Sequence, residues 1–148
     1  MLGDKKISEI MTPAPLDSIE CSSTIQAAAK LMKQTKKSFL IVLENGRAMG
    51  VVTERDIVRR VVAENVNPTT TNVSVIMSSP IISVDPDDTV SDVARFMDDR
   101  GIRRVIVMKK DLILGAATSK DFVKVIVTEG DKDVQFFRAM MRASAPRY

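Results

Sequence analysis

The sequence contains no histidine, a single cysteine (Cys21) and only 4% aromatic residues. Without histidine there is no mixed His/Cys zinc site, no Ser-His or Cys-His nucleophile pair, and no side chain that ordinarily titrates near neutral pH. A lone cysteine excludes an internal disulfide and a cysteine-rich metal cluster. We therefore expect no catalytic residue, no metal site and no enzymatic activity.

Long apolar runs and a strong excess of charge are also missing. No apolar run approaches the roughly 20 residues that cross a bilayer, and the opening residues 1–6 lack the charged-then-apolar pattern of a signal segment. The net charge is +3, from 22 basic and 19 acidic residues, which gives little support for nucleic-acid binding because few aromatics are available to stack bases. We expect a cytoplasmic protein of one or two small globular domains that makes no membrane contact.

The chain is a tandem repeat. Residues 15–64 align without a gap to residues 80–129 at a constant offset of 65, and thirteen of these fifty positions are identical, including Pro15/Pro80, Thr24/Thr89, Gly50/Gly115, Thr53/Thr118 and Asp56/Asp121. The match continues upstream with a slip of one residue, Ile10-Met11-Thr12 against Ile76-Met77-Ser78. The chain therefore consists largely of two copies of one structural unit.

Each copy predicts the order strand, helix, strand, strand, helix, and hence an α/β (α+β) fold. Thr24 and Thr89 are candidate N-caps, and Asn45-Gly46 between two apolar runs indicates a hairpin. The predicted extended segments are 16–19 and 81–84, and the predicted hairpins pair 39–43 with 48–52 in the first copy and 105–108 with 112–117 in the second. The first helices follow Thr24 and Thr89, and their predicted buried faces are Ile25, Ala28, Ala29 and Met32 in the first copy and Val90, Val93, Ala94 and Met97 in the second. The closing helices begin at Thr53, with apolar residues Ile57, Val58, Val61 and Val62, and at Thr118, with Phe122, Val125 and Ile126.

These elements divide the chain into residues 7–64, a linker of loop composition at 65–72, and residues 73–129. A unit of about 60 residues buries only part of its surface alone, so we expect the copies to pack face to face with pseudo-two-fold symmetry. Residues 130–148 lie outside the repeat and predict a short amphipathic C-terminal helix or tail.

The sharpest shared motif is Gly50-Val-Val-Thr53-Glu-Arg55-Asp56, whose twin runs from Gly115 through Thr118 and Lys120 to Asp121. Two interpretations fit it. Thr followed three residues later by an acid resembles a capping box, in which both side chains satisfy the helix start. The same geometry also presents a carboxylate to vicinal hydroxyls and a helix N-terminus to an anion, as in nucleotide sites.

The G-h-h-T-x-x-D motif (h, apolar), the Ile-Met-Thr/Ser opening and the tandem units resemble the CBS domain pair over residues 7–129. The resemblance implies a tandem CBS fold, clefts between the two units that bind adenosine-containing ligands, and frequent dimerisation. It implies one site built from Thr53, Arg55, Asp56, Ser78, Ile81 and Ile82, a second from Thr12, Leu16, Asp17, Thr118, Lys120 and Asp121, and phosphate-side residues at Lys37, Ser38 and Phe39 and at Arg103 and Arg104.

The two sites are predicted to be inequivalent. Asp17 stands where the family often has an apolar or small residue, and Ala116-Ala117 replace Val51-Val52. Arginine forks hold phosphate better than lysine does, so we expect the side with Arg103 and Arg104 to bind phosphate better, although two arginines at a strand edge can also be ordinary surface residues.

As a whole, the resemblance implies a regulatory module that binds AMP, ADP or ATP, uses no catalytic cofactor, forms a homodimer and signals to a regulated protein of unknown identity. Two alternatives stay open. One is a sensor of S-adenosylmethionine, and the other is a nucleic-acid or structural interaction protein, which the weak charge excess does not favour.

Overall fold

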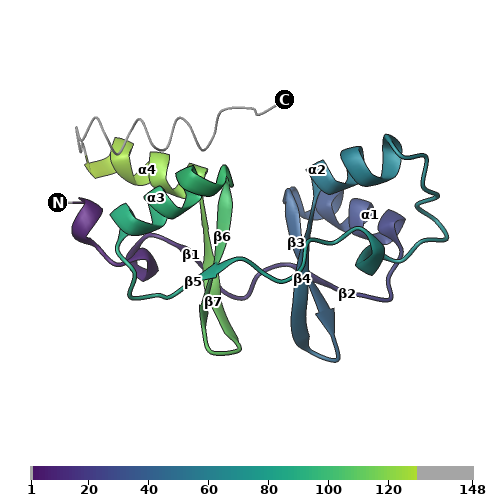
Figure 1. Ribbon diagram of the computed structural model, residues 1–148, viewed down its shortest axis with the longest axis horizontal. Helices are drawn as coiled ribbons and strands as arrows, with labels where there is room; N and C mark the ends of the chain where they lie inside the picture. Colours follow the sequence, from purple (N-terminus) through teal and green to yellow (C-terminus); the bar gives the residue numbers. More distant parts are fainter. Residues whose placement is uncertain (1, 130–148) are drawn as a thin grey trace. The chain divides into compact units, whose positions relative to one another are not determined.

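The computed structural model describes residues 2–129, which form an α+β fold of two compact units (Figure 1). One unit consists of residues 16–81, and the other of residues 2–15 together with 82–129; they are called the 16–81 unit and the 82–129 unit. These units do not coincide with the sequence repeats, because each repeat's opening segment folds with the hairpin of the other repeat. The predicted helix of residues 130–148 lies outside the described residues.

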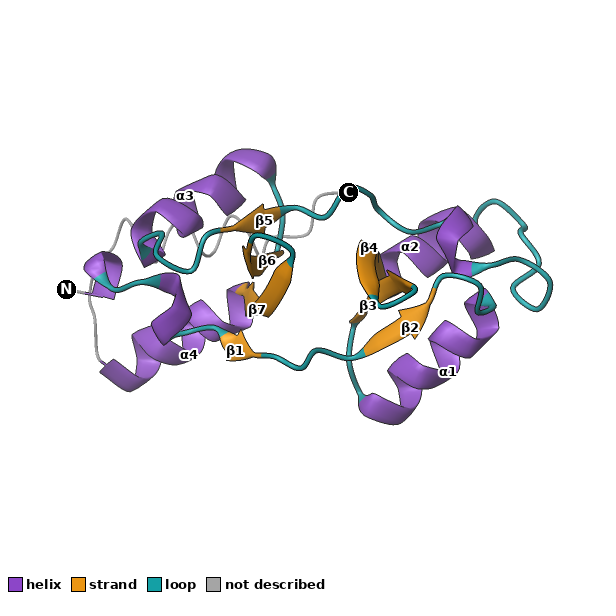
Figure 2. Cartoon of the chain, turned by 90° about the horizontal axis from the view of Figure 1, so that it is seen from below, coloured by secondary structure: helices purple, strands orange, loops and turns teal. Residues whose placement is uncertain are grey.

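The 16–81 unit has a three-stranded sheet with its helices on one face (Figure 2). Its elements are β2 (Ser18–Glu20), α1 (Ile25–Thr35), β3 (Phe39–Glu44), β4 (Arg47–Thr53), α2 (Glu54–Ile57), the π-helical turn η3 (Val58–Val62) and the 3₁₀ turn η4 (Val73–Val75). Strand β2 is parallel to β3, which is antiparallel to β4. The core between sheet and helices includes Ile25, Met32, Leu40, Val42 and Val61.

The 82–129 unit repeats this arrangement and adds an edge strand. Its elements are η1 (Leu2–Asp4), η2 (Ile7–Glu9), β1 (Thr12–Pro13), β5 (Ser83–Val84), α3 (Val90–Arg100), β6 (Arg104–Lys109), β7 (Leu112–Thr118) and α4 (Ser119–Glu129). The sheet order is β1-β7-β6-β5, with only the β5–β6 pair parallel. Leu2 and Ile7 are buried in the core of this unit beside Phe122, so the N-terminal segment completes it.

The helix starts and the hairpin confirm the sequence predictions. The hydroxyl oxygens of Thr24 and Thr89 each accept a hydrogen bond of 3.1 Å from the backbone N–H three residues on. Asn45 and Gly46 have φ of 51° and 79°, the left-handed conformations that a tight two-residue hairpin needs. The predicted faces of the first helices are buried, except that Ala29 is half-buried.

Three local features differ from what the sequence predicted. Strands β2 and β5 begin about two residues later than the extended segments predicted at 16–19 and 81–84. Strand β1 was not predicted, since a two-residue edge strand has no periodicity to read. In the closing helix after Thr53, Val61 is buried but Val58 and Val62 are 60% and 71% exposed, because the helix passes into a π turn at Val58 and leaves the 3.6-residue period.

Within residues 2–129, no helix combines the length and apolar character needed to cross a membrane. The predicted linker 65–72 has neither helix nor regular strand, but it packs on the start of α1, where Ile25 N donates to Thr71 O (3.0 Å) and Gln26 N to Pro68 O (2.9 Å).

Candidate functional site

The Asp56 carboxylate lies at the junction of β4 and α2. Thr53 N donates to Asp56 Oδ2 (2.9 Å), and Asp56 N donates to Thr53 Oγ1 (3.0 Å). This reciprocal pair confirms the capping-box interpretation. The Asp56 side chain is only 12% exposed, and its second oxygen, Oδ1, takes no part in the cap.

Asp121 occupies the equivalent position between β7 and α4. Its Oδ2 accepts from Thr118 N (2.9 Å) and from Thr118 Oγ1 (3.1 Å), while Asp121 N donates to Thr118 Oγ1 (3.3 Å). Its Oδ1 accepts from Thr12 Oγ1 at 3.1 Å. The structure therefore brings together three of the predicted site residues, Thr12, Thr118 and Asp121.

Glycine in the motif allows another segment to cross the strand. A Cβ at Gly50 would lie 2.6 Å from the Ser78 carbonyl oxygen and 2.9 Å from Met77 Sδ. At Gly115, a Cβ would overlap the Thr12 carbonyl oxygen and lie 2.8 Å from Met11 Sδ. The Ile-Met-Thr/Ser openings thus pass directly over these glycines, which places Ser78 beside the strand that leads to Asp56 and Thr12 beside Asp121.

The predicted phosphate-side residues lie next to the same helix starts. Glu54 N, at the start of α2, donates to Ser38 O (3.0 Å), and Ser119 N, at the start of α4, donates to Arg103 O (3.0 Å). In the strand register Phe39 is opposite Thr53 and Arg104 is opposite Thr118. Lys37 and Ser38 are exposed, whereas Phe39, Arg103 and Arg104 are half-buried.

The remaining candidates are spread over both units. Arg55 and Lys120 are exposed in the first turns of α2 and α4. Ile81 belongs to the unit that holds Asp56, whereas Ile82, 46% exposed, belongs to the 82–129 unit.

Leu16 and Asp17 belong to the 16–81 unit, although the resemblance grouped them with Asp121. Asp17 O accepts from Ile41 N (2.9 Å), so the backbone of Asp17 extends the β2–β3 pairing of its own unit.

Sequence reasoning missed Arg60. Its Nη1 donates to Ile76 O (3.0 Å) and contacts Met77 O (3.3 Å), while its Nε lies 3.8 Å from Asp56 Oδ1. The equivalent residue in the second repeat is Val125. The signal that could have identified Arg60 was a charged residue at a position that is apolar in the other copy, but the site residues of the shared motif were chosen where both repeats have an identical or similar residue.

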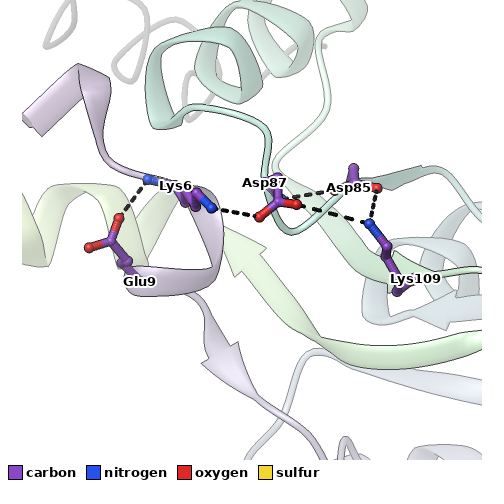
Figure 3. Close-up of polar contacts among 5 residues, drawn as sticks. All are labelled: Lys6, Glu9, Asp85, Asp87 and Lys109. Atoms are coloured by element: carbon purple, nitrogen blue, oxygen red, sulfur yellow. Dashed lines mark hydrogen bonds and ion pairs between the residues drawn. The ribbon is translucent and has the colours of Figure 1, made fainter.

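In the 82–129 unit a cluster of exposed charges holds the N-terminal segment (Figure 3). Lys6 Nζ pairs with Asp87 Oδ1 (2.9 Å), and Lys109 Nζ lies 3.5 Å from Asp85 Oδ2 and 3.9 Å from Asp87 Oδ2. The hydrogen bond and the charge of Lys6 lower the pKa of Asp87, and the same contact raises the pKa of Lys6. In the other unit, residues 20–23 (Glu-Cys-Ser-Ser) replace residues 85–88 (Asp-Pro-Asp-Asp).

A family model described as the CBS domain matches residues 7–63 and 73–128. The chain belongs to the CBS domain family. The two matches follow the sequence repeats rather than the compact units. CBS domain pairs are in general regulatory, ligand-binding modules, and the fold described above is the one they share.

Curated relatives of this CBS protein include an uncharacterized protein from Methanopyrus kandleri, 31% identical over 84% of this chain and 61% of that protein. The CBS domain-containing protein YhcV of Bacillus subtilis is 30% identical over 80% of this chain and 79% of its own length. A second archaeal relative, from Methanocaldococcus jannaschii, is 32% identical, but the chain spans only 33% of its length.

Solved structures give the same fold. An uncharacterized conserved protein from Pyrococcus horikoshii matches with a TM-score of 0.79 and 25% identity, over 84% of this chain and 94% of that one. A hexameric CBS-CP12 protein from bloom-forming cyanobacteria matches with a TM-score of 0.73 and 34% identity, over 87% and 76% of the two chains.

Proposed function

We propose that this CBS protein is a non-catalytic regulatory module that binds an adenine nucleotide (AMP, ADP or ATP) at Asp56 and at Asp121, and that a partner protein responds to the bound state. One observation carries the proposal. In both units the first-turn aspartate caps its helix with one carboxylate oxygen, and the other oxygen lies near a side chain associated with the crossing segment, which is the Ile-Met-Thr/Ser segment that passes over the motif glycine. That side chain is Thr12, within the segment, for Asp121, and Arg60, which binds the segment's backbone, for Asp56.

A carboxylate oxygen outside the cap suits the vicinal hydroxyls of a ribose. An ionised carboxylate has about four acceptor positions, and hydrogen bonds to a charged group are the stronger kind. The Asp121 carboxylate accepts from Thr118 and Thr12, which leaves acceptor capacity for a ligand.

Basic groups supply a place for the phosphates. Arg103 precedes β6 and its carbonyl oxygen contacts the start of α4, where Lys120 is exposed. The N-terminus of the eleven-residue helix α4 also carries the positive end of the helix dipole. These features favour a phosphorylated nucleoside over a neutral one, and they support stronger phosphate binding in the 82–129 unit.

The regulatory step is differential affinity. A nucleotide that binds one arrangement of the protein more tightly than another shifts the population toward it, and a partner can read that shift. We propose that the module acts as a homodimer in the cytoplasm, with a regulated protein of unknown identity as its partner.

Calorimetric titration with AMP, ADP, ATP and S-adenosylmethionine tests the proposal. We expect at least one adenine nucleotide to bind. At a free nucleotide concentration of 100 times its Kd, it should raise the free energy of unfolding by about 2.7 kcal/mol. The variants Asp56→Asn and Asp121→Asn keep an oxygen for the helix cap but remove the charge, so each should weaken its own site about ten-fold or more. The variant Asp87→Asn, an equal charge change outside either site, is the matched control and should bind like the wild type.

Three results would contradict the proposal. If S-adenosylmethionine binds and none of the nucleotides does, the ligand is a sulfonium compound and not an adenine nucleotide. Salt-dependent binding of an oligonucleotide that AMP and ATP do not displace would favour the nucleic-acid alternative. No response of the melting temperature to any of the four small molecules would remove the ligand-binding function.

A further inference from the structure

The two units hold the crossing segment beside the aspartate by different contacts. In the 82–129 unit the tether is a hydroxyl, since Thr12 Oγ1 donates directly to Asp121 Oδ1. The equivalent residue in the 16–81 unit is Ser78, whose backbone pairs with Val51 through hydrogen bonds of 3.0 and 2.8 Å. Among the described residues, no hydrogen bond joins the Ser78 side chain to Asp56. Arg60 makes the connection instead.

Arg60 reaches both sides of this junction from the π turn. Its Nη1 donates to the carbonyl oxygens of Ile76 and Met77 (3.0 and 3.3 Å), just before Ser78, and its Nε lies 3.8 Å from Asp56 Oδ1. The Arg60 side chain is 51% exposed and that of Asp56 is 12% exposed. One guanidinium therefore fixes the backbone of the crossing segment and places a positive charge beside the largely buried carboxylate.

The distance between Arg60 Nε and Asp56 Oδ1 decides what this contact does to a ligand. At 3.8 Å it is an ion pair but lies outside the range of an N–H···O hydrogen bond. The lone pairs of Asp56 Oδ1 therefore stay available to hydroxyl donors. Asp121 Oδ1 differs, because it already accepts the Thr12 hydroxyl at 3.1 Å.

The adjacent positive charge also reduces the cost of covering Asp56 with a ligand. An ionised carboxylate that loses its water without a counter-charge is strongly disfavoured, and one beside a guanidinium is disfavoured less. Val125, the equivalent of Arg60 in the second repeat, cannot supply such a charge to Asp121.

We propose that Arg60 is a positioning residue that makes the Asp56 site the more ribose-selective of the two. It holds the crossing segment by the carbonyl oxygens of Ile76 and Met77 and places its charge beside Asp56 Oδ1, which stays ready to accept from vicinal hydroxyls, and it leaves the phosphate contacts to other residues. This inference rests on the proposed nucleotide-binding function, and it names which of the two sites distinguishes a ribonucleotide from its 2′-deoxy counterpart.

The test measures Kd values for AMP and 2′-deoxy-AMP by calorimetry in an Asp121→Asn background, so that the heat reports on the Asp56 site. The variant Arg60→Gln should weaken AMP binding about ten-fold, the equivalent of one hydrogen bond to a charged group. It should weaken 2′-deoxy-AMP binding by a smaller factor, because that ligand has one hydroxyl fewer to donate to Asp56. The preference for the ribose diol should therefore fall. Arg60→Lys restores the charge and should recover part of that preference.

Two controls separate this role from a structural one. Arg59→Gln removes the same charge from the neighbouring position and should keep the parent's AMP to 2′-deoxy-AMP ratio. The melting temperature without ligand shows whether Arg60→Gln still folds. If it does not fold, the ratio of the AMP and 2′-deoxy-AMP Kd values is measured in Arg60→Lys instead. A ratio equal to that of the Asp121→Asn parent, with no loss of AMP affinity, overturns the inference.

The failures can be told apart. If adding Asp56→Asn to the Asp121→Asn background leaves AMP binding unchanged, nucleotide binding at Asp56 is wrong and the inference falls with it. If Asp56→Asn abolishes binding but Arg60→Gln keeps the parent's diol preference, the proposed function stands and the role of Arg60 is refuted.

Discussion

Replacing Gly50 with alanine should destabilise the protein because the new methyl group has no room. Its Cβ would lie 2.6 Å from the Ser78 carbonyl oxygen and 2.9 Å from Met77 Sδ. Overpacking of this kind costs about 2 kcal/mol. The displaced segment would also weaken the two hydrogen bonds between Val51 and Ser78, for about 1 kcal/mol more. The total, about 3 kcal/mol, corresponds to a fall in Tm of about 9 °C for a chain of this size.

Differential scanning calorimetry of Gly50→Ala against Gly46→Ala measures this effect. Gly46 has φ of 79°, and a methyl group added there would meet no heavy atom within 4 Å, so its alanine variant loses only the left-handed preference, about 1 kcal/mol. Gly115→Ala, which crowds the backbone of Thr12 in the same way, should match Gly50→Ala. A Gly50→Ala protein that melts no lower than Gly46→Ala would refute the steric argument.

Two smaller predictions concern the helix cap and the charge cluster. Thr24→Ala removes the acceptor for Ala27 N and should cost about 1 kcal/mol of unfolding free energy, measured by urea denaturation; an unchanged midpoint would contradict the cap. Asp87→Asn should lower Tm slightly, because the pair with Lys6 is exposed and screened by salt. The pKa of Asp87 is lowered in the fold, so its contribution to folding stability is present above about pH 3.8 and is lost as pH falls through the folded pKa. The pKa of Lys6 is raised in the fold, so its contribution to folding stability is present below about pH 10.5 and is lost as pH rises through the folded pKa. The Tm difference from the wild type should therefore close in acid, and a difference that persists at pH 2 would contradict the linkage.

The sequence predicted what local chemistry controls. Thr24 and Thr89 cap helices because a short hydroxyl side chain satisfies an N–H that the helix leaves unpaired. Asn45-Gly46 makes a hairpin turn because both residues tolerate positive φ. The capping box at Thr53 and Asp56 was one of two interpretations of the motif, and it is present. These features depend on neighbours within a few residues, which a sequence displays directly.

Contacts between distant segments could not be read in the same way. Ile7 is completely buried and its N–H donates to Asp88 O, 81 residues away, yet nothing in the opening residues indicates that partner. Arg60 lies in a π turn, where the helical period that locates faces no longer holds. Its hydrogen bonds go to Ile76 and Met77, which reach it only through the loop that follows the first repeat.

Duplication explains why the two aspartates share a cap, and divergence explains why they differ beyond it. The cap needs only Thr and Asp three residues apart, so both copies keep it while the residues around it change. With Ser78 the carboxylate at Asp56 has no hydroxyl tether among the described residues, and Arg60 holds the segment by its carbonyl oxygens. In the other unit the Thr12 hydroxyl donates directly to the Asp121 carboxylate, and the position equivalent to Arg60 is the apolar Val125. If both aspartates bind a nucleotide as we propose, the residues outside the shared motif, rather than those within it, determine what each site can accept.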